Sequence, residues 1–219
     1  MTMPPMTRPG HRRRGTLVAA AVVLAVALIA GGAVAAVTLM SGDGGRAPVY
    51  ARRDKVCDLV DVAPLAALSL AERAGAGRTT ARGADGGDGD DPYVRCEIQV
   101  SPAATESGYD LRATVDFYPD ASAATDGYVD EQERLDSMAG SSRSDVSGVG
   151  RAAFFGTDLL YGESDGDRYT MTTFHVIARD RNVVVSVGLG LVRDPDWNQA
   201  AVRDALIPIA RAILTGLDS

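Results

Sequence analysis

The stretch that decides the fold is YTMTTFHVIARDRNVVVSVGLGL, which runs from residue 169 to residue 191. Apolar and polar residues alternate on both sides of Asp180-Arg181, which is typical of two antiparallel strands joined by a tight turn. A turn at Asp180-Arg181 sets Ala178 opposite Val183. One face of the hairpin is then apolar, and we expect it to form the core; it carries Phe174, Val176, Ala178, Val183, Val185, Val187 and Leu189.

Further strands are predicted before this hairpin. Residues 93–100 and residues 109–118 each alternate apolar and polar positions over a length typical of strands. A linker rich in serine and glycine follows at 140–150, and short strands are expected at 152–155 and 159–161. These segments predict that the sheet is built mainly from neighbouring antiparallel strands.

Two helices are predicted before the hairpin. The first spans residues 63–74, with Pro64 in its first turn and Gly75 just after its end. The second follows Asp120, a suitable N-cap residue, and continues to about Ala139.

A third helix is predicted at the end of the sequence, with Asp194 as N-cap and Pro195 at its first position. Pro208 is expected to kink or divide it. Its apolar stripe repeats at steps of four, three, four and four residues: Val202, Leu206, Ile209, Ile213 and Leu217. The order helix, strands, helix, strands, helix predicts an α+β domain in which helices pack on an antiparallel sheet.

Residues 16–40 contain no charged side chain. As a helix this stretch would be about 37 Å long, which is enough to cross a bilayer. The cluster Arg12-Arg13-Arg14 precedes it, so the positive-inside rule places the N-terminus in the cytoplasm. We therefore predict a single-pass protein of the cell membrane, which contacts membrane lipid through this helix and has its C-terminal domain outside.

A cleaved signal peptide is the alternative, because Ala33-Val34-Ala35 is an A-x-A site. The apolar run continues beyond it to Met40, which favours an uncleaved anchor. The domain is outside the membrane in both cases. Ala27, Gly31 and Ala35 form a small-xxx-small stripe that could pair two helices, although alanine and glycine are so common here that chance explains the stripe better.

These observations divide the chain into four parts: a cytoplasmic basic tail at 1–15, a transmembrane helix at 16–40, a tether at 41–55 and an extracytoplasmic α+β domain at 56–219. Within the domain, residues 75–92 have no apolar side chain larger than alanine. We expect a mobile acidic loop there, because such a segment buries too little surface to offset its ordering entropy.

The domain is acidic. The first 40 residues hold four of the 22 basic side chains and no acid, so the remainder has 18 basic and 29 acidic residues, a net charge of −11. Nucleic-acid binding is not expected, since phosphate contacts need clustered Lys and Arg. Arginine supplies every basic position except Lys55, a bias typical of GC-rich coding that points to an actinobacterial origin.

No catalytic motif stands out. His175 is the only histidine beyond the predicted membrane segment, no G-x-S-x-G motif occurs, and we interpret His175 as a surface or second-layer residue. Asp116, Glu131 and Asp136 could in principle support glycoside chemistry, but sequence spacing alone brings no two of them together. They are interpreted as solvated residues.

No metal or cofactor site is predicted. Asp85, Asp88, Asp90 and Asp91 resemble a calcium loop, but Pro92 takes the place of a ligand and no glutamate follows at the required distance. Asp165-Gly166-Asp167 fails in the same way, although weak calcium binding stays open. Gly188 and Gly190 lie within a predicted strand, so they do not indicate a nucleotide site.

The two cysteines, Cys57 and Cys96, most simply form a disulfide in an oxidising compartment. Two free thiols or a redox role are the alternatives, although there is no C-x-x-C. Closing a loop of about 40 residues would stabilise the fold by roughly 3–4 kcal/mol in the chain-entropy model.

Residues 56–100 carry a resemblance. The opening Cys57-Asp58-Leu59-Val60, the predicted helix ending at glycine, the polar loop and the strand at Cys96 resemble a family of actinobacterial envelope lipoproteins of unknown function, which share a C-x-L-L-type opening and a later C-x-[WYT] strand. The resemblance implies a bridge between the two cysteines and no enzymatic activity. Glu97-Ile98 departs from the pattern, and no lipidated cysteine follows the apolar stretch.

The sequence therefore favours a non-enzymatic domain of the cell envelope that binds another protein, a cell-wall component or a small ligand. The alternatives are an extracytoplasmic hydrolase that uses carboxylates, and a cleaved secreted protein.

Overall fold

A computed structural model describes residues 49–83, 93–102, 108–164, 167–192 and 197–219. The predicted membrane helix at 16–40 and Asp85, Asp88, Asp90 and Asp91 lie outside these ranges. Within them, no helix is both long enough and apolar enough to span a membrane. Ala47–Ser219 form one compact unit.

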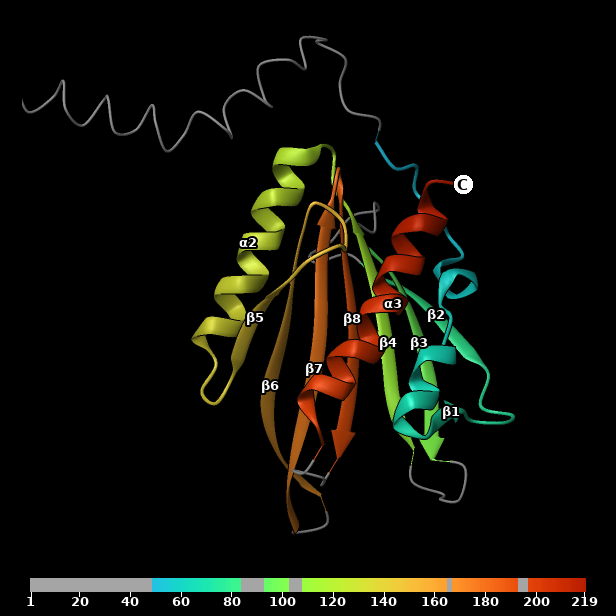
Figure 1. Ribbon diagram of the computed structural model, residues 1–219, viewed down its shortest axis with the longest axis vertical. Coiled ribbons are helices and arrows are strands. Elements are labelled where there is room, and N and C mark those ends of the chain that lie inside the picture. Colours follow the sequence, from blue (N-terminus) through green and yellow to red (C-terminus); the bar gives the residue numbers. More distant parts are fainter. Residues whose placement is uncertain (1–48, 84–92, 103–107, 165–166, 193–196) are drawn as a thin grey trace, which may run out of the picture. The chain divides into compact units, whose positions relative to one another are not determined.

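In the described part of the chain, eight strands form one antiparallel sheet in the order β1-β3-β4-β8-β7-β6-β5, with β2 also paired to β3 (Figure 1). This confirms the predicted α+β domain built on an antiparallel sheet. The strands are β1 Leu70–Glu72, β2 Arg78–Gly83, β3 Tyr93–Pro102, β4 Tyr109–Phe117, β5 Ser142–Val146, β6 Ala152–Ser164, β7 Asp167–Asp180 and β8 Val183–Val192.

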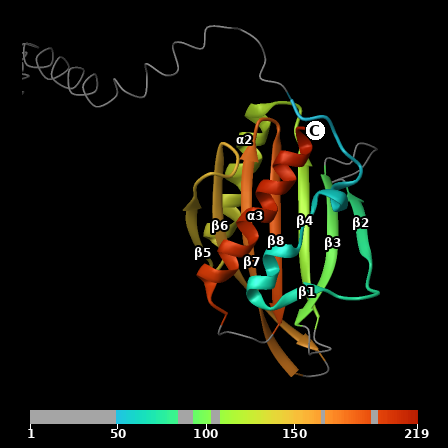
Figure 2. The same cartoon turned by 45° about the vertical axis from the view of Figure 1, so that its right-hand side comes forward.

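Helices cover both faces of this sheet (Figure 2). On one face α3 contacts β7 and β8 together with the two short 3-10 helices, and on the other face α2 packs on β5 to β8. The helices are η1 Val56–Leu59, η2 Ala63–Leu68, α2 Ala121–Ser137 and α3 Gln199–Leu217.

The predicted hairpin is present as β7 and β8, but its turn is at Arg181-Asn182 and not at Asp180-Arg181. Asp180 pairs with Val183, which shifts the register by two residues from the predicted one. Because side chains alternate with a period of two, this shift keeps every residue on its predicted face. Arg181 has a φ of 47°, the left-handed conformation that the tight turn requires.

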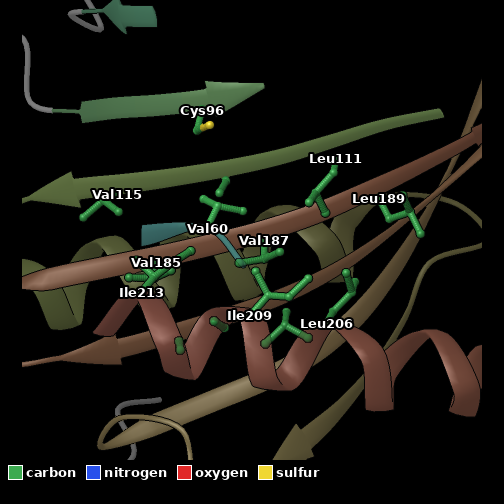
Figure 3. Close-up of a cluster of buried hydrophobic side chains, with 14 of the residues drawn as sticks. Val60, Cys96, Leu111, Val115, Val185, Val187, Leu189, Leu206, Ile209 and Ile213 are labelled. Carbon is green, nitrogen blue, oxygen red and sulfur yellow. The ribbon is translucent and has the colours of Figure 1, made fainter. Parts of the chain in front are cut away.

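The core on the α3 side contains the apolar face predicted for the hairpin. Figure 3 shows α3 laid against β8, with Leu206, Ile209 and Ile213 beside Val185 and Val187. All of these side chains are buried. Burial of one such side chain contributes about 1.5–3 kcal/mol, so this layer supplies most of the apolar stabilisation.

The bounds of α3 differ from the prediction. The helix begins at Gln199, where the Asn198 side chain accepts hydrogen bonds from the N–H groups of Ala200 and Ala201. The predicted N-cap Asp194 lies outside the described residues. Pro208 does not divide the helix. The buried stripe of α3 offsets the lost hydrogen bond, which costs about 3 kcal/mol.

The first predicted helix, at 63–74, is wrong in its second half. Only η2 is helical; Ser69 then takes a left-handed φ of 59° and the chain enters β1. The predicted mobile loop at 75–92 contains β2, which pairs with β3 beyond the part that β1 occupies. The backbone N–H and C=O groups of this polar edge form hydrogen bonds with β3. The spacing of apolar residues in the sequence does not reveal such pairing.

The middle of the chain is more regular than expected. The linker predicted at 140–150 contains β5, and the two short strands predicted at 152–155 and 159–161 are parts of the single strand β6. The second helix is confirmed as α2, and the side chain of Asp120 caps it by accepting hydrogen bonds from two backbone N–H groups.

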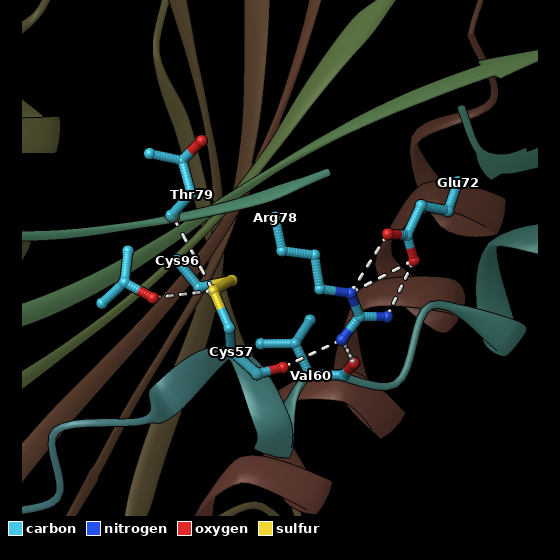
Figure 4. Close-up of a disulfide and its surroundings, with 7 residues drawn as sticks. Cys57, Val60, Glu72, Arg78, Thr79 and Cys96 are labelled. Carbon is cyan, nitrogen blue, oxygen red and sulfur yellow. Dashed lines mark hydrogen bonds and ion pairs between the residues drawn. A yellow bond between two sulfur atoms is a disulfide. The ribbon is translucent and has the colours of Figure 1, made fainter. Parts of the chain in front are cut away.

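Cys57 and Cys96 form the predicted disulfide, which joins η1 to β3 (Figure 4). Arg78 of β2 lies beside it. The Arg78 guanidinium donates hydrogen bonds of 2.9 Å to the carbonyl groups of Cys57 and Val60, and pairs with Glu72 at 2.8 Å. It therefore satisfies carbonyl groups at the end of η1, a role that the sequence analysis missed.

The predicted tether at 41–55 is not free along its whole length, because Tyr50 is buried against the turn between β7 and β8. Its N–H group donates to Asn182 Oδ1 at 2.7 Å, and its hydroxyl donates to Asp180 Oδ2 at 2.7 Å. Burial raises the pKa of Tyr50, and the hydrogen bond to Asp180 and the Asp180 charge raise it further. The ordered domain therefore begins at least six residues before the predicted boundary at 56.

Candidate functional site

The sheet face opposite α3 carries a row of functional side chains at its centre. Arg112 of β4 lies across from Gly188 of β8, and Gly188 lies across from His175 of β7. The next row contains Asp110, Gly190 and Thr173 in the same strand order. These two rows bring together residues that are far apart in the sequence.

A groove of about 150 Å³ lies over these rows. Its charged groups are Arg112 and Asp110, and its imidazole is His175. Hydroxyl groups lie along it, from Thr114, Thr173 and Ser186. The groove therefore presents hydrogen-bond donors and acceptors around a floor that has little side-chain bulk.

The two glycines of β8 shape that floor. A Cβ atom at Gly188 would lie 3.1 Å from His175 Nδ1, whereas the nearest atom to a Cβ at Gly190 is Met171 Sδ at 3.8 Å. The Nδ1 edge of the imidazole thus occupies the space above Gly188. Glycine inside a strand often marks a place where another group approaches the backbone closely. At Gly188 that group is the His175 ring.

His175 is held by a buried acid. Its Nε2 lies 3.1 Å from Asp158 Oδ2, and the Asp158 side chain is 6% exposed. Arg134 of α2 lies 3.9 Å from the same oxygen. The interpretation of His175 as a surface or second-layer residue did not include this pair, which depends on the register between β6 and β7.

The contact with Asp158 determines which nitrogen of the His175 ring donates a hydrogen bond and which one accepts. Burial alone raises the pKa of Asp158, but the hydrogen bond and charge of His175 outweigh it, together with smaller effects of Thr173 and Arg134, so that the pKa is lowered. Asp158 is then a carboxylate at neutral pH and can only accept the hydrogen bond, so the tautomer that fits it carries its proton on Nε2. Nδ1 therefore presents a lone pair over Gly188.

Arg112 is oriented from the other side. Its Nε donates to Glu97 Oε1 at 3.1 Å, and Glu97 also lies 3.9 Å from Arg95. Within the described ranges, the two terminal nitrogens of Arg112 have no hydrogen-bond partner. The guanidinium can therefore donate two hydrogen bonds to a molecule in the groove.

The acids proposed for glycoside chemistry are not brought together in the groove. Glu131 pairs with Arg134 at 2.9 Å, and Asp136 pairs with Arg143 at 3.0 Å. Asp116 lies in β4, outside the groove lining. The acid that does line the groove is Asp110, which the sequence analysis did not single out.

No group of three His, Cys, Asp or Glu side chains that could hold a metal occurs among the residues described. Asp165 and Gly166 of the second acidic motif lie outside those residues, while Asp167 begins β7. The weak calcium site left open by the sequence stays a prediction.

Neither the known family profiles nor the curated proteins contain a match to this sequence. Among solved structures, the chain is similar to the extracellular domain of PknH from Mycobacterium tuberculosis, with a TM-score of 0.43 and 12% identity. The alignment covers 80% of this chain and 99% of that one. The resemblance to actinobacterial envelope lipoproteins stays a prediction.

Proposed function

We propose that this protein is a membrane-anchored, extracytoplasmic binding protein whose groove holds a small ligand or the end of a larger envelope molecule. The observation that carries the proposal is the row formed by Arg112, Gly188 and His175. A volume of about 150 Å³ is below the 300–1,000 Å³ typical of pockets for drug-sized ligands. The groove therefore suits a small group.

A binding role fits the groove better than carboxylate-dependent hydrolysis. Such a hydrolase needs two acids together, one of them with a raised pKa so that it can donate a proton. Asp110 lines the groove, and the nearby Asp158 has a lowered pKa. If the purified protein turned over ester, glycoside or peptide substrates and one substitution in the groove abolished this, the binding role would be wrong.

The proposed location is supported by the uncharged stretch at 16–40 behind Arg12-Arg13-Arg14 and by the pairing of Cys57 with Cys96. We expect the full chain in the membrane fraction, with its domain cut by protease added outside intact cells. N-terminal sequencing distinguishes the anchored form from a cleaved, secreted one. A full chain that is soluble in the cytosol with both thiols reduced would contradict the location.

The groove itself is tested with a blocking substitution. Gly190→Leu places its Cβ at ordinary contact distances and projects a side chain into the groove. We expect small polar fragments that shift NMR signals of the detergent-solubilised full chain to lose binding in Gly190→Leu. They should bind normally to Thr79→Leu, a substitution at an exposed position of β2. If every fragment bound both variants equally, the groove would not be the binding site.

A further inference from the structure

We infer that the groove recognises a secondary amide group, with the amide carbonyl accepting from Arg112 and the amide N–H donating to His175. This inference rests on the proposed binding function and specifies the chemistry of its ligand. Secondary amides occur both in acetamido sugars and in peptides, and the test below separates these two sources.

Arg112 and His175 are spaced so that a small group fits between them. Neighbouring strands lie about 4.8 Å apart, so the Cα atoms of Arg112 and His175 are about 10 Å apart, with Gly188 between them. Both side chains line the groove from opposite sides of this glycine. A small planar group held between the two side chains can therefore meet the guanidinium on one side and the Nδ1 edge of the imidazole on the other.

The two sides of the groove offer opposite hydrogen-bonding roles. Arg112 is fixed through Nε by Glu97 and can only donate. His175 has its Nε2 proton directed at Asp158, so its Nδ1 can only accept while the ring is neutral. The ligand group must therefore carry an acceptor and a donor next to each other.

Carboxylate, ammonium and secondary amide groups differ in how well they meet this requirement. A carboxylate suits Arg112 but has no hydrogen to donate to His175 Nδ1. An ammonium group suits His175 but is repelled by Arg112. A secondary amide supplies a carbonyl oxygen and an N–H group in one plane, and the missing side chain at Gly190, where a Cβ would meet no atom closer than 3.8 Å, leaves room for a flat group near the sheet. The hydroxyl groups of Thr114 and Ser186 are then available to the rest of the ligand.

The test compares matched probes by titration calorimetry on the full chain in detergent. Diacetylchitobiose and cellobiose are both disaccharides, but only diacetylchitobiose has acetamido groups. N-acetyl-alanyl-alanine amide represents a peptide. Acetate represents a carboxylate. We expect at least one amide probe to bind about tenfold or more tightly than cellobiose and acetate. The tighter amide probe identifies the source as a sugar or a peptide.

Substitutions then assign the contact. Arg112→Met should weaken binding of the amide probe about tenfold. Arg82→Met is the control and should leave binding unchanged, because Arg82 is a similarly exposed arginine that pairs with Asp54 outside the groove. His175→Phe should also weaken binding about tenfold. His175→Gln should retain most of it, because a glutamine carbonyl can still accept the amide N–H.

Failure of the inference differs from failure of the proposed function. If acetate or cellobiose bound as tightly as the amide probes, and Gly190→Leu abolished that binding, the groove would still be a binding site but not for amides. If Arg112→Met and Arg82→Met behaved alike, the contact would be wrong. If no probe or fragment bound in the groove, the proposed function would fail as well.

Discussion

The two faces of the sheet differ sharply in what they bury. On the α3 side, strands and helix share one continuous apolar core that reaches from β1 to β6. On the α2 side, a separate and smaller cluster lies under the helix and consists of Ala124, Tyr128, Leu135, Phe154, Ile177 and Val184. Beyond that cluster the same face is polar and carries the groove.

This difference separates stability from recognition. Alternation along each strand sends the large aliphatic residues to the α3 side, where they pack closely. The α2 side keeps glycine, hydroxyl and charged residues, which contribute less to folding and are available to a ligand. We therefore expect substitutions on the first face to change the free energy of unfolding, and substitutions in the groove to change binding instead.

The largest effect is expected at Ile209. Ile209→Ala should lower the free energy of unfolding by about 4 kcal/mol, because Ile209 is fully buried in the α3-side core. Urea denaturation measures the loss. Ile207→Ala is the control on the same helix, since Ile207 is only partly buried. Equal losses for the two variants would mean that the α3-side core does not dominate stability.

The disulfide has the next largest effect. Replacing Cys57 and Cys96 with serine should lower the free energy of unfolding by about 3–4 kcal/mol, because the unfolded chain regains the freedom of a loop of 39 residues. Chemical denaturation with and without reductant measures this. The reductant should destabilise the natural chain and leave the double serine variant unchanged; any effect on that variant would point to a different cause.

A smaller loss is expected on the opposite face. Leu135→Ala should cost about 2–3 kcal/mol, because its cluster has few members and α2 can move towards the sheet to fill part of the space. Val129→Ala on the exposed side of α2 should cost less than about 0.5 kcal/mol. A loss at Leu135 as large as the loss at Ile209 would remove the contrast between the two faces.

The smallest effect depends on pH and involves Tyr50. The folded state raises the pKa of Tyr50 above the value of about 10 that tyrosine has when unfolded. The neutral phenol therefore stabilises the fold below pH 10, and this contribution, about 1 kcal/mol, is lost as the pH rises above 10. Tyr50→Phe should lack this loss in urea titrations between pH 8 and 11, whereas Tyr109→Phe should retain it.

Much of the fold could be predicted from local patterns. Alternation identified β3, β4 and the faces of β7 and β8, and side-chain caps and apolar steps identified α2 and the buried stripe of α3. The edge formed by β1 and β2 could not be predicted in this way, because its polar residues are ordered by hydrogen bonds to β3. The pattern of apolar residues within β1 and β2 does not indicate that β3 is their partner.

The groove was harder to predict than the fold. His175 and Asp158 are 17 residues apart, and they meet only because β6 and β7 pair in one particular register. Gly188 and Gly190 were visible as strand glycines, but their place between Arg112 and His175 depends on strand order. Each of these residue types is common in any domain, so the site exists only in their three-dimensional arrangement.

The attachment of Tyr50 also determines how the domain would respond to mechanical load. Tension applied to the chain ahead of Tyr50 reaches Asn182 first, because the two residues exchange hydrogen bonds through the backbone of one and the amide of the other. Arg181 beside it is paired with Asp218 after the last helix, which spreads the load to the C-terminal end. The disulfide at Cys57 lies further along the chain, so the contacts of Tyr50 lie between it and the load.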